Sequence, residues 1–123
     1  MKLIPLLESI VITKLFHKSP PTFRKSIKSN GLIPRIGDSY QLYYGDSPHL
    51  KQHTKPCIFA TNNPDKDFYD STYDDDIWEI NQEIAGVEWE LDPAFDDENY
   101  VRTFDKIKPE ALTLVYKGTG ESL

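Results

Sequence analysis

Hydrophobic residues recur along the chain in short runs, several of them with the two-residue period of β-strands. At 87–91 the alternation is strict, so that Val87, Trp89 and Leu91 share one face. The other runs are β-branched, aromatic or apolar and are bounded by polar turn residues, as strands are. They lie at 10–17, 57–61, 77–81, 100–104 and 112–116. The pattern therefore predicts about six short strands.

The clearest local unit follows the first of these strands. Ser19 stands at a helix N-cap position, with Pro20 at the first helical position. Phe23 and Ile27 lie four residues apart and predict one buried helix face. Gly31 predicts a left-handed cap that ends the helix.

The remaining segments are predicted to be loops, turns and chain ends. A long loop at 35–56 is rich in Gly, Pro and Tyr, and long loops in small domains often bind ligands. We expect a polar loop at 62–76 and a helical turn that begins at 108–110. Residues 1–9 are an arm or a short helix, and residues 117–123 are a frayed tail. With one or two short helices and a strand-dominated sheet, the 123 residues predict a single α+β domain.

Charge and composition narrow the classes of function. A net charge of −6, from 14 basic and 20 acidic side chains, argues against a nucleic-acid partner. The basic residues nevertheless gather in the first third of the chain, which leaves room for a locally positive site for an anionic ligand. The single cysteine, Cys57, fits a reducing compartment. The apolar start contains Pro5 and Glu8, lacks a signal-peptide cleavage site, and is too short to cross a bilayer, so we expect a soluble cytoplasmic protein without a membrane partner.

Familiar catalytic and metal-binding motifs are absent from the sequence. There is no phosphate loop, dinucleotide glycine fingerprint, cysteine pair, zinc-protease helix or nucleophile elbow. His49 and His53 have the spacing of metal ligands on a helix, but Pro48 places them in a loop, which favours surface histidines. The acidic run 74–76 lacks the glycine and the distal glutamate of a calcium loop, so a solvated acidic loop is favoured. No metal site is expected.

Three segments follow one another in an order that is typical of a known family. Leu-Phe-His-Lys-Ser at 15–19 is followed by a helix, by Gly31 and Leu32, by the long loop, and by Ile-Phe-Ala-Thr at 58–61. This order, with 98–117 as a closing pair of strands, resembles the ADP-ribosyltransferase fold. It is most similar to small members from bacteria and bacteriophages, and to the NAD-binding half of RNA 2′-phosphotransferases. The resemblance implies a split, mostly antiparallel sheet.

The resemblance also implies an NAD site. In that family the first-strand histidine hydrogen-bonds a ribose hydroxyl of NAD, and an aromatic residue on a later strand stacks on the nicotinamide. Carried over, His17 binds the ribose, Ser19 shapes the same pocket, and Phe59 stacks without the hydroxyl of the usual tyrosine. Tyr43 or Tyr44 from the long loop is the alternative source of a ring.

The family's glutamate, which stabilises the positive charge that develops as the glycosidic bond breaks, has no single match here. Glu98 is the closest carboxylate, although strict alignment places Tyr100 at that position. Glu79 is the other carboxylate on a predicted strand. Arg35 and Arg24 are candidates for holding the pyrophosphate.

Each of these residues also has a purely structural interpretation. A histidine that ends a strand is more often structural than functional. Phe59 lies in an apolar run that suits the core, and Glu98 lies in a polar turn that suits solvent. Trp78 and Trp89 are most simply core or interface aromatic residues.

Three functions follow from the resemblance. The first is an NAD-dependent ADP-ribosyltransferase that uses NAD as a substrate and a host macromolecule as the acceptor. The second is an inactive ADP-ribosyltransferase-like interaction module with a protein assembly partner, borne by a bacteriophage and located in the host cytoplasm or the virion. The ring of Phe59 without a hydroxyl and the displaced Glu98 favour this second function. An RNA 2′-phosphotransferase ranks last, because it would need several arginines around the histidine and a basic partner domain.

Overall fold

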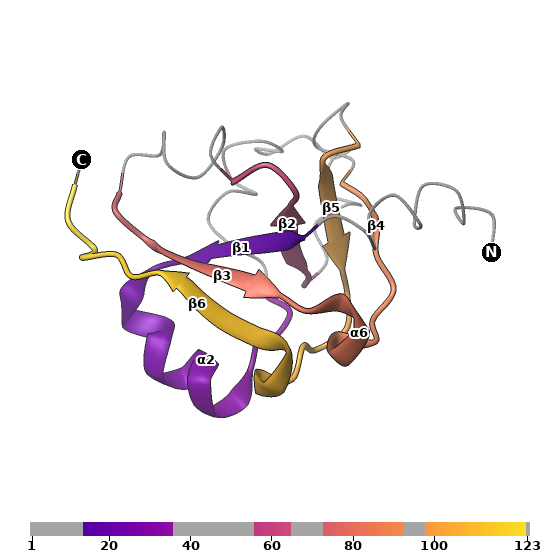
Figure 1. The fold of residues 1–123 in the computed structure, drawn as a ribbon, viewed down its shortest axis with the longest axis horizontal. Coiled ribbons are helices and arrows are strands. Elements are labelled where there is room, and N and C mark those ends of the chain that lie inside the picture. Colours follow the sequence, from indigo (N-terminus) through magenta and orange to yellow (C-terminus); the bar gives the residue numbers. More distant parts are fainter. Residues whose placement is uncertain (1–13, 36–55, 65–72, 93–97, 123) are drawn as a thin grey trace.

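A computed structural model describes residues 14–35, 56–64, 73–92 and 98–122 of the chain (Figure 1). The predictions that lie outside the described residues concern residues 1–9, most of the loop at 35–56, Tyr43, Tyr44, His49 and His53.

The described residues form six strands and four short helical segments. The strands are β1 (Leu15–Ser19), β2 (Ile58–Thr61), β3 (Asp76–Ile80), β4 (Glu90–Leu91), β5 (Tyr100–Thr103) and β6 (Leu112–Tyr116). The helical segments are η1 (Pro21–Phe23), α2 (Arg24–Asn30), α6 (Gln82–Ala85) and η2 (Pro109–Ala111). The predicted α+β class is thus confirmed, although the strand predicted at 87–91 keeps only its last two residues.

The six strands form one open antiparallel sheet in the order β4-β5-β2-β1-β3-β6. The ladder between β1 and β3 spans all five residues of β1, from Leu15 to Ser19. The ladder between β1 and β2 has the single registered pair Phe16 and Thr61. We call this junction the seam. On its two sides the strands differ in direction: β1, β3 and β6 run across the view of Figure 1, whereas β2, β5 and β4 run steeply.

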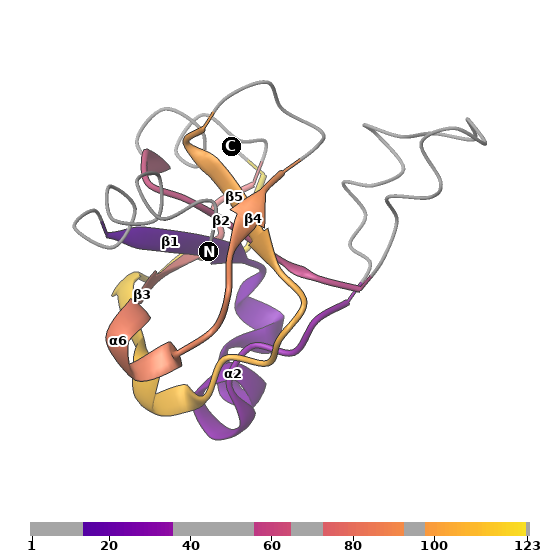
Figure 2. The ribbon, with the colours of Figure 1, turned by 90° about the vertical axis from the view of Figure 1, so that its right-hand side faces the viewer.

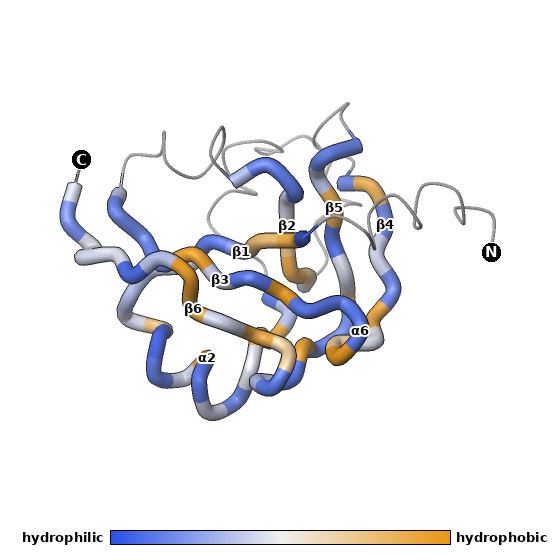
Figure 3. Tube along the Cα trace, in the orientation of Figure 1, coloured by the Kyte–Doolittle hydropathy of each residue, from blue (hydrophilic) through white to orange (hydrophobic). Residues whose placement is uncertain are grey.

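The core lies on one face of this sheet. Figure 2 shows α2 and α6 on the same side of β1, and Figure 3 shows that α2 is largely hydrophilic, with Ile27 as its buried residue. The core cluster consists of Leu15, Ile27, Leu32, Ile58, Ala60, Trp78, Ile80, Trp89, Val101, Ile107 and Ala111. Both tryptophans belong to it, as their structural interpretation predicted.

The helix after β1 begins later than the sequence predicted. Ser19 is the last residue of β1 and makes no capping bond, so its predicted role as an N-cap is wrong. The two prolines that follow it lead into the 3-10 turn η1 instead. Ile27 is buried as predicted, whereas Phe23 is exposed, because η1 turns it away from the core.

Gly31 ends α2 with a positive φ of 79° and donates its N–H to the carbonyl of Ile27. A Cβ at this position would overlap the carbonyl of Ile107. The adjacent Leu32 exchanges two backbone hydrogen bonds with Ile107, at 2.9 and 3.0 Å. The glycine is therefore required by a close approach of two backbone segments as well as by its φ.

The sequence predicted a frayed tail at 117–123, but residues 117–122 are ordered by hydrogen bonds to the chain before β3. Asp74 donates its N–H to Glu121 at 3.0 Å and accepts the N–H of Gly120 at 2.8 Å. Tyr73 and Ser122 form a bridge beyond them. This segment therefore runs beside the residues that lead into β3.

Candidate functional site

The side chain of His17 lies at the seam, in the middle of β1 rather than at its end. Its Nδ1 lies 2.7 Å from the backbone oxygen of Phe59 on β2. Because a carbonyl only accepts hydrogen bonds, Nδ1 carries the proton, and Nε2 is left as an acceptor in the neutral ring. This side-chain bond joins β1 to β2 where their backbone ladder has stopped.

The environment of His17 keeps the ring neutral. Burial lowers the pKa of His17 below its ordinary value of 6.5, the hydrogen bond to Phe59 opposes this shift, and the charge of Arg35 adds to it. Among the described residues Nε2 has no hydrogen-bond partner. The seam therefore presents one unpaired acceptor, which suits a hydroxyl or amide donor.

Arg35 supplies the positive charge that acts on His17. Its backbone pairs with Cys57 through two hydrogen bonds of 3.2 Å, which fix it beside the start of β2. Its guanidinium carbon lies 4.3 Å from the centre of the Phe23 ring. Within the described ranges this guanidinium has no ion-pair partner, so it is able to meet an anion.

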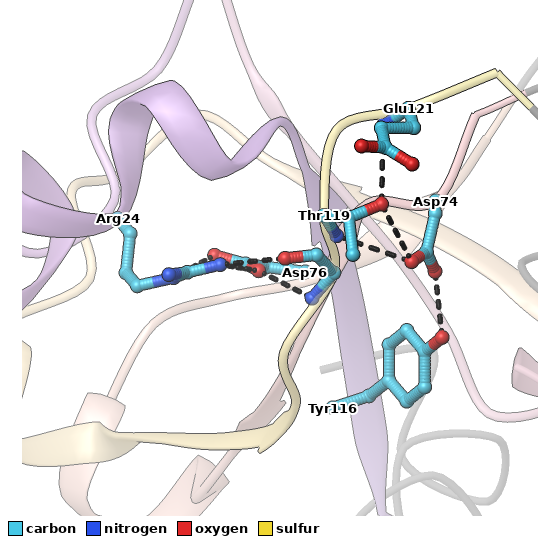
Figure 4. Close-up of polar contacts among 7 residues, drawn as sticks. Arg24, Asp74, Asp76, Tyr116, Thr119 and Glu121 are labelled. Carbon is cyan, nitrogen blue, oxygen red and sulfur yellow. Dashed lines mark hydrogen bonds and ion pairs between the residues drawn. The ribbon is translucent and has the colours of Figure 1, made fainter.

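Arg24, the other arginine proposed for the pyrophosphate, has a different role. Its Nε and Nη2 donate to the two carboxylate oxygens of Asp76 at 2.8 and 2.7 Å, and Nη2 also donates to the carbonyl of Gly118 at 2.9 Å (Figure 4). The guanidinium of Arg24 therefore donates three hydrogen bonds within the protein, and these hold it in a structural role. Of the two arginines, only Arg24 has an ion-pair partner among the described residues.

Ser19 and Trp78 lie near His17 on the same face of the sheet. Trp78 is the direct register partner of His17 on β3, and Ser19 is two residues along β1. Ser19 Oγ and Trp78 Nε1 are both buried without a hydrogen-bond partner among the described residues. Ser19 was predicted to shape the pocket of His17, whereas Trp78 was predicted only as a core or interface residue, because the register between strands cannot be read from hydrophobic alternation.

The ring of Phe59 lies on the other face of the sheet. Thr61 pairs with Phe16, so Phe59, two residues before it, shares a face with Phe16 rather than with His17. Phe59 is partly buried, lies outside the core cluster and is the register partner of Arg102. Its contact with His17 is therefore made through the carbonyl and not through the ring.

Neither proposed carboxylate is a register neighbour of His17. Glu79 pairs with Phe16, projects from the opposite face and lies 3.3 Å from the ammonium of Lys14. Glu98 is exposed in the turn before β5, two residues ahead of Tyr100, whose partner is Thr61 at the end of β2. The structure thus places Ser19 and Trp78 on the same face as His17. The charge of Arg35 acts on the His17 ring. Neither Glu79 nor Glu98 is a register neighbour of His17.

The acidic run 74–76 is not the solvated loop that was predicted, because each of its carboxylates has a partner within the protein. Asp74 accepts the Tyr116 hydroxyl at 2.6 Å, and Asp75 lies 3.7 Å from the ammonium of Lys18. Asp76 is fully buried and binds Arg24, as described above. In the part of the chain that the structure describes, no cluster of three or more potential metal ligands occurs.

The partners of these three carboxylates shift their pKa values in different directions. The Tyr116 hydroxyl holds the pKa of Asp74 below its ordinary value. Burial raises the pKa of Asp75 more than the nearby Lys18 lowers it. Burial also opposes ionisation of Asp76, but the hydrogen bonds from Arg24 and the Gly118 N–H lower its pKa overall.

No helix in the described ranges is long and apolar enough to span a bilayer. Comparison of the chain with models of known protein families, with curated proteins and with solved structures found no match.

Proposed function

We propose that the chain is an ADP-ribosyltransferase-like protein that binds NAD at the seam between β1 and β2. The observation that carries the proposal is the neutral imidazole of His17, whose Nδ1–H is held by Phe59 and whose Nε2 is an unpaired acceptor among the described residues. A ribose hydroxyl donates to Nε2, and a phosphate oxygen accepts from the guanidinium of Arg35. The combination of one acceptor and one nearby cation matches the ribose and the pyrophosphate of a dinucleotide.

In the catalytic form of this proposal, the protein transfers ADP-ribose to a host macromolecule. The bond between the anomeric carbon and nicotinamide breaks, and the electron pair leaves with neutral nicotinamide. A nucleophile of the acceptor then bonds to the anomeric carbon and releases its proton to solvent. A carboxylate stabilises the oxocarbenium-like centre that forms between these events. Glu98 is the residue proposed for that role.

The second candidate is an ADP-ribosyltransferase-like module that binds without catalysis and joins a protein assembly, as a phage-borne component of a virion would. The observation that favours it is the placement of the two glutamates. Glu79 projects from the face opposite His17 and faces Lys14, and Glu98 is exposed in a turn. Binding through His17 and Arg35 needs neither of them.

The two candidates separate in a measurement of nicotinamide release from NAD, made alongside calorimetric binding of NAD. We expect wild type to bind NAD and both His17→Ala and Arg35→Gln to bind it at least about tenfold more weakly. Release that is abolished in Glu98→Gln but retained in the matched Glu79→Gln supports transfer. Binding without release, together with a stable protein complex in gel filtration, supports the interaction module.

Two other results would count against the proposal. A wild-type protein that neither binds NAD nor releases nicotinamide excludes both an NAD site and transfer. Turnover that is unchanged in His17→Ala excludes the seam as the site, while leaving the activity itself in place.

A further inference from the structure

Two polar groups near His17 are buried without partners. Ser19 is 7% exposed and Trp78 is 2% exposed, and neither Ser19 Oγ nor Trp78 Nε1 finds a hydrogen-bond partner among the described residues. Buried donors and acceptors in folded proteins are nearly always satisfied, because an unpaired one loses its bonds to water and gains nothing in return. Two such groups near an unpaired imidazole nitrogen point to a missing ligand.

The sheet places these groups in one row. Trp78 is directly opposite His17 in the β1–β3 ladder, where facing Cβ atoms lie roughly 4.5–5.5 Å apart. Ser19 follows His17 on the same face, next to β3. The row therefore offers an acceptor from His17, a donor from Trp78 and a hydroxyl from Ser19 that is able to do either.

We infer that Trp78 is a ligand-binding residue of the NAD site, and that it recognises the cis-diol of a ribose. One hydroxyl of the diol donates to Nε2 of His17, and the oxygen of the neighbouring hydroxyl accepts the indole N–H of Trp78. The Ser19 hydroxyl, which is able both to donate and to accept, forms a further hydrogen bond with one of these two ribose hydroxyls. This inference rests on the proposed function and assigns its ligand contact to a residue that the family resemblance did not supply.

Binding of a ligand to the row requires a local rearrangement of the protein. Neither Trp78 Nε1 nor Ser19 Oγ touches solvent in this conformation, so the groups that cover them must shift to admit a hydroxyl. β1 is held to β2 by one registered pair and the His17–Phe59 bond, whereas five registered pairs hold it to β3. The hydrogen bonds that a ligand forms with the row, which the unliganded protein lacks, offset the free-energy cost of this rearrangement.

The test uses the indole N–H resonances of the two tryptophans in ¹⁵N-labelled protein. Trp89 is a matched internal control, since its Nε1 is also buried and unpaired but β5 and β2 separate its neighbour β4 from β1. We expect titration with ADP-ribose to shift the Trp78 resonance and to leave that of Trp89 in place. Nicotinamide alone, which has no ribose, should move neither.

Affinity provides the second arm of the test. Trp78→Phe should bind ADP-ribose roughly tenfold more weakly than wild type, whereas Trp89→Phe should stay within about twofold. If Trp78→Phe fails to fold, the wild-type resonances still decide the question. ADP-ribose that binds wild type without moving the Trp78 resonance overturns the role of Trp78 and leaves the proposed function standing. Failure of wild type to bind both ADP-ribose and NAD overturns the proposed function itself.

Discussion

Arg24 and Asp76 are 52 residues apart and form a pair with two hydrogen bonds, of 2.8 and 2.7 Å. The Asp76 carboxylate also accepts the N–H of Gly118 at 2.8 Å, and the carbonyl of Gly118 accepts from Arg24 (Figure 4). One buried carboxylate thereby joins the start of α2, the start of β3 and the chain after β6. Ser19, the register partner of Asp76, places this junction at the end of β1.

We expect Asp76→Asn to lower the melting temperature by about 5–10 °C, because it leaves Arg24 and the Gly118 N–H without an ionised acceptor. Thermal unfolding followed by circular dichroism measures the change. The neighbouring Asp75→Asn is the matched control and should change the melting temperature by less than about 2 °C, since burial already disfavours the Asp75 charge. Equal losses in the two variants would show that Asp76 has no special role.

Acid should weaken the fold through two carboxylates of the acidic run, those of Asp74 and Asp76. The pKa values of Asp74 and Asp76 lie below their ordinary value of 3.8 in the folded protein, so the unfolded chain takes up protons first as the pH falls. Their contribution is complete above that value and is lost below it. We expect the melting temperature to fall as the pH is lowered from about 5 to about 3, and to fall less steeply in Asp76→Asn. Parallel curves for the two proteins would contradict this assignment.

The lowered pKa of His17 should be visible directly by NMR titration of its ring protons, as a midpoint below 6.5. Since the unfolded chain binds this proton more readily, the contribution of His17 to stability is complete above pH 6.5 and is lost as the pH falls toward the folded pKa. Arg35→Gln should raise the midpoint because a nearby positive charge is removed, whereas Arg35→Lys should keep it low. If the titration midpoint of His17 is the same in wild type, Arg35→Gln and Arg35→Lys, the charge of Arg35 does not act on the ring.

Gly31→Ala should destabilise the protein by about 3 kcal/mol or more, since a Cβ there meets the backbone of Ile107 in addition to the unfavourable φ. Gly86→Ala is the matched control, with a φ of 61° and open space around a Cβ. It should cost only the conformational penalty of about 1 kcal/mol. Urea unfolding measures both changes, and a smaller loss for Gly31→Ala than for Gly86→Ala would refute the close approach.

The sequence predicted those features that depend on local pattern. Alternation and β-branched runs located β2, β3, β5 and β6, because each strand needs only its own side-chain period to be recognised. Gly31 was identified as the end of the helix because a glycine after a helical face has few other uses. Its φ of 79° is combined with a ψ of −165°, so the left-handed cap that was predicted does not form. The helix α6 was overlooked, although Asn81 caps its start and Gly86 ends it, because four residues carry no helical period.

Features that depend on contacts between residues far apart in the sequence could not be predicted from local pattern. The acidic run looked solvated because nothing near it in the sequence reveals that Arg24, Lys18 and the 117–120 segment supply its cations and donors. Ser19 looked like a helix cap because the ladder with β3 that makes it a strand residue forms with residues far along the chain. The pairing of His17 with Trp78 could not be predicted for the same reason, because it also depends on the register between β1 and β3.

The bond between Arg24 and the carbonyl of Gly118 joins residues that are 94 positions apart. During synthesis, Asp76 and Arg24 leave the ribosome well before Gly118 does, so the carboxylate at first has only part of its final set of donors. The junction at the end of β1 is therefore completed only after the chain beyond β6 has been made. A nascent chain that stalls before Gly118 would hold the Asp76 carboxylate through Arg24, without the N–H of Gly118.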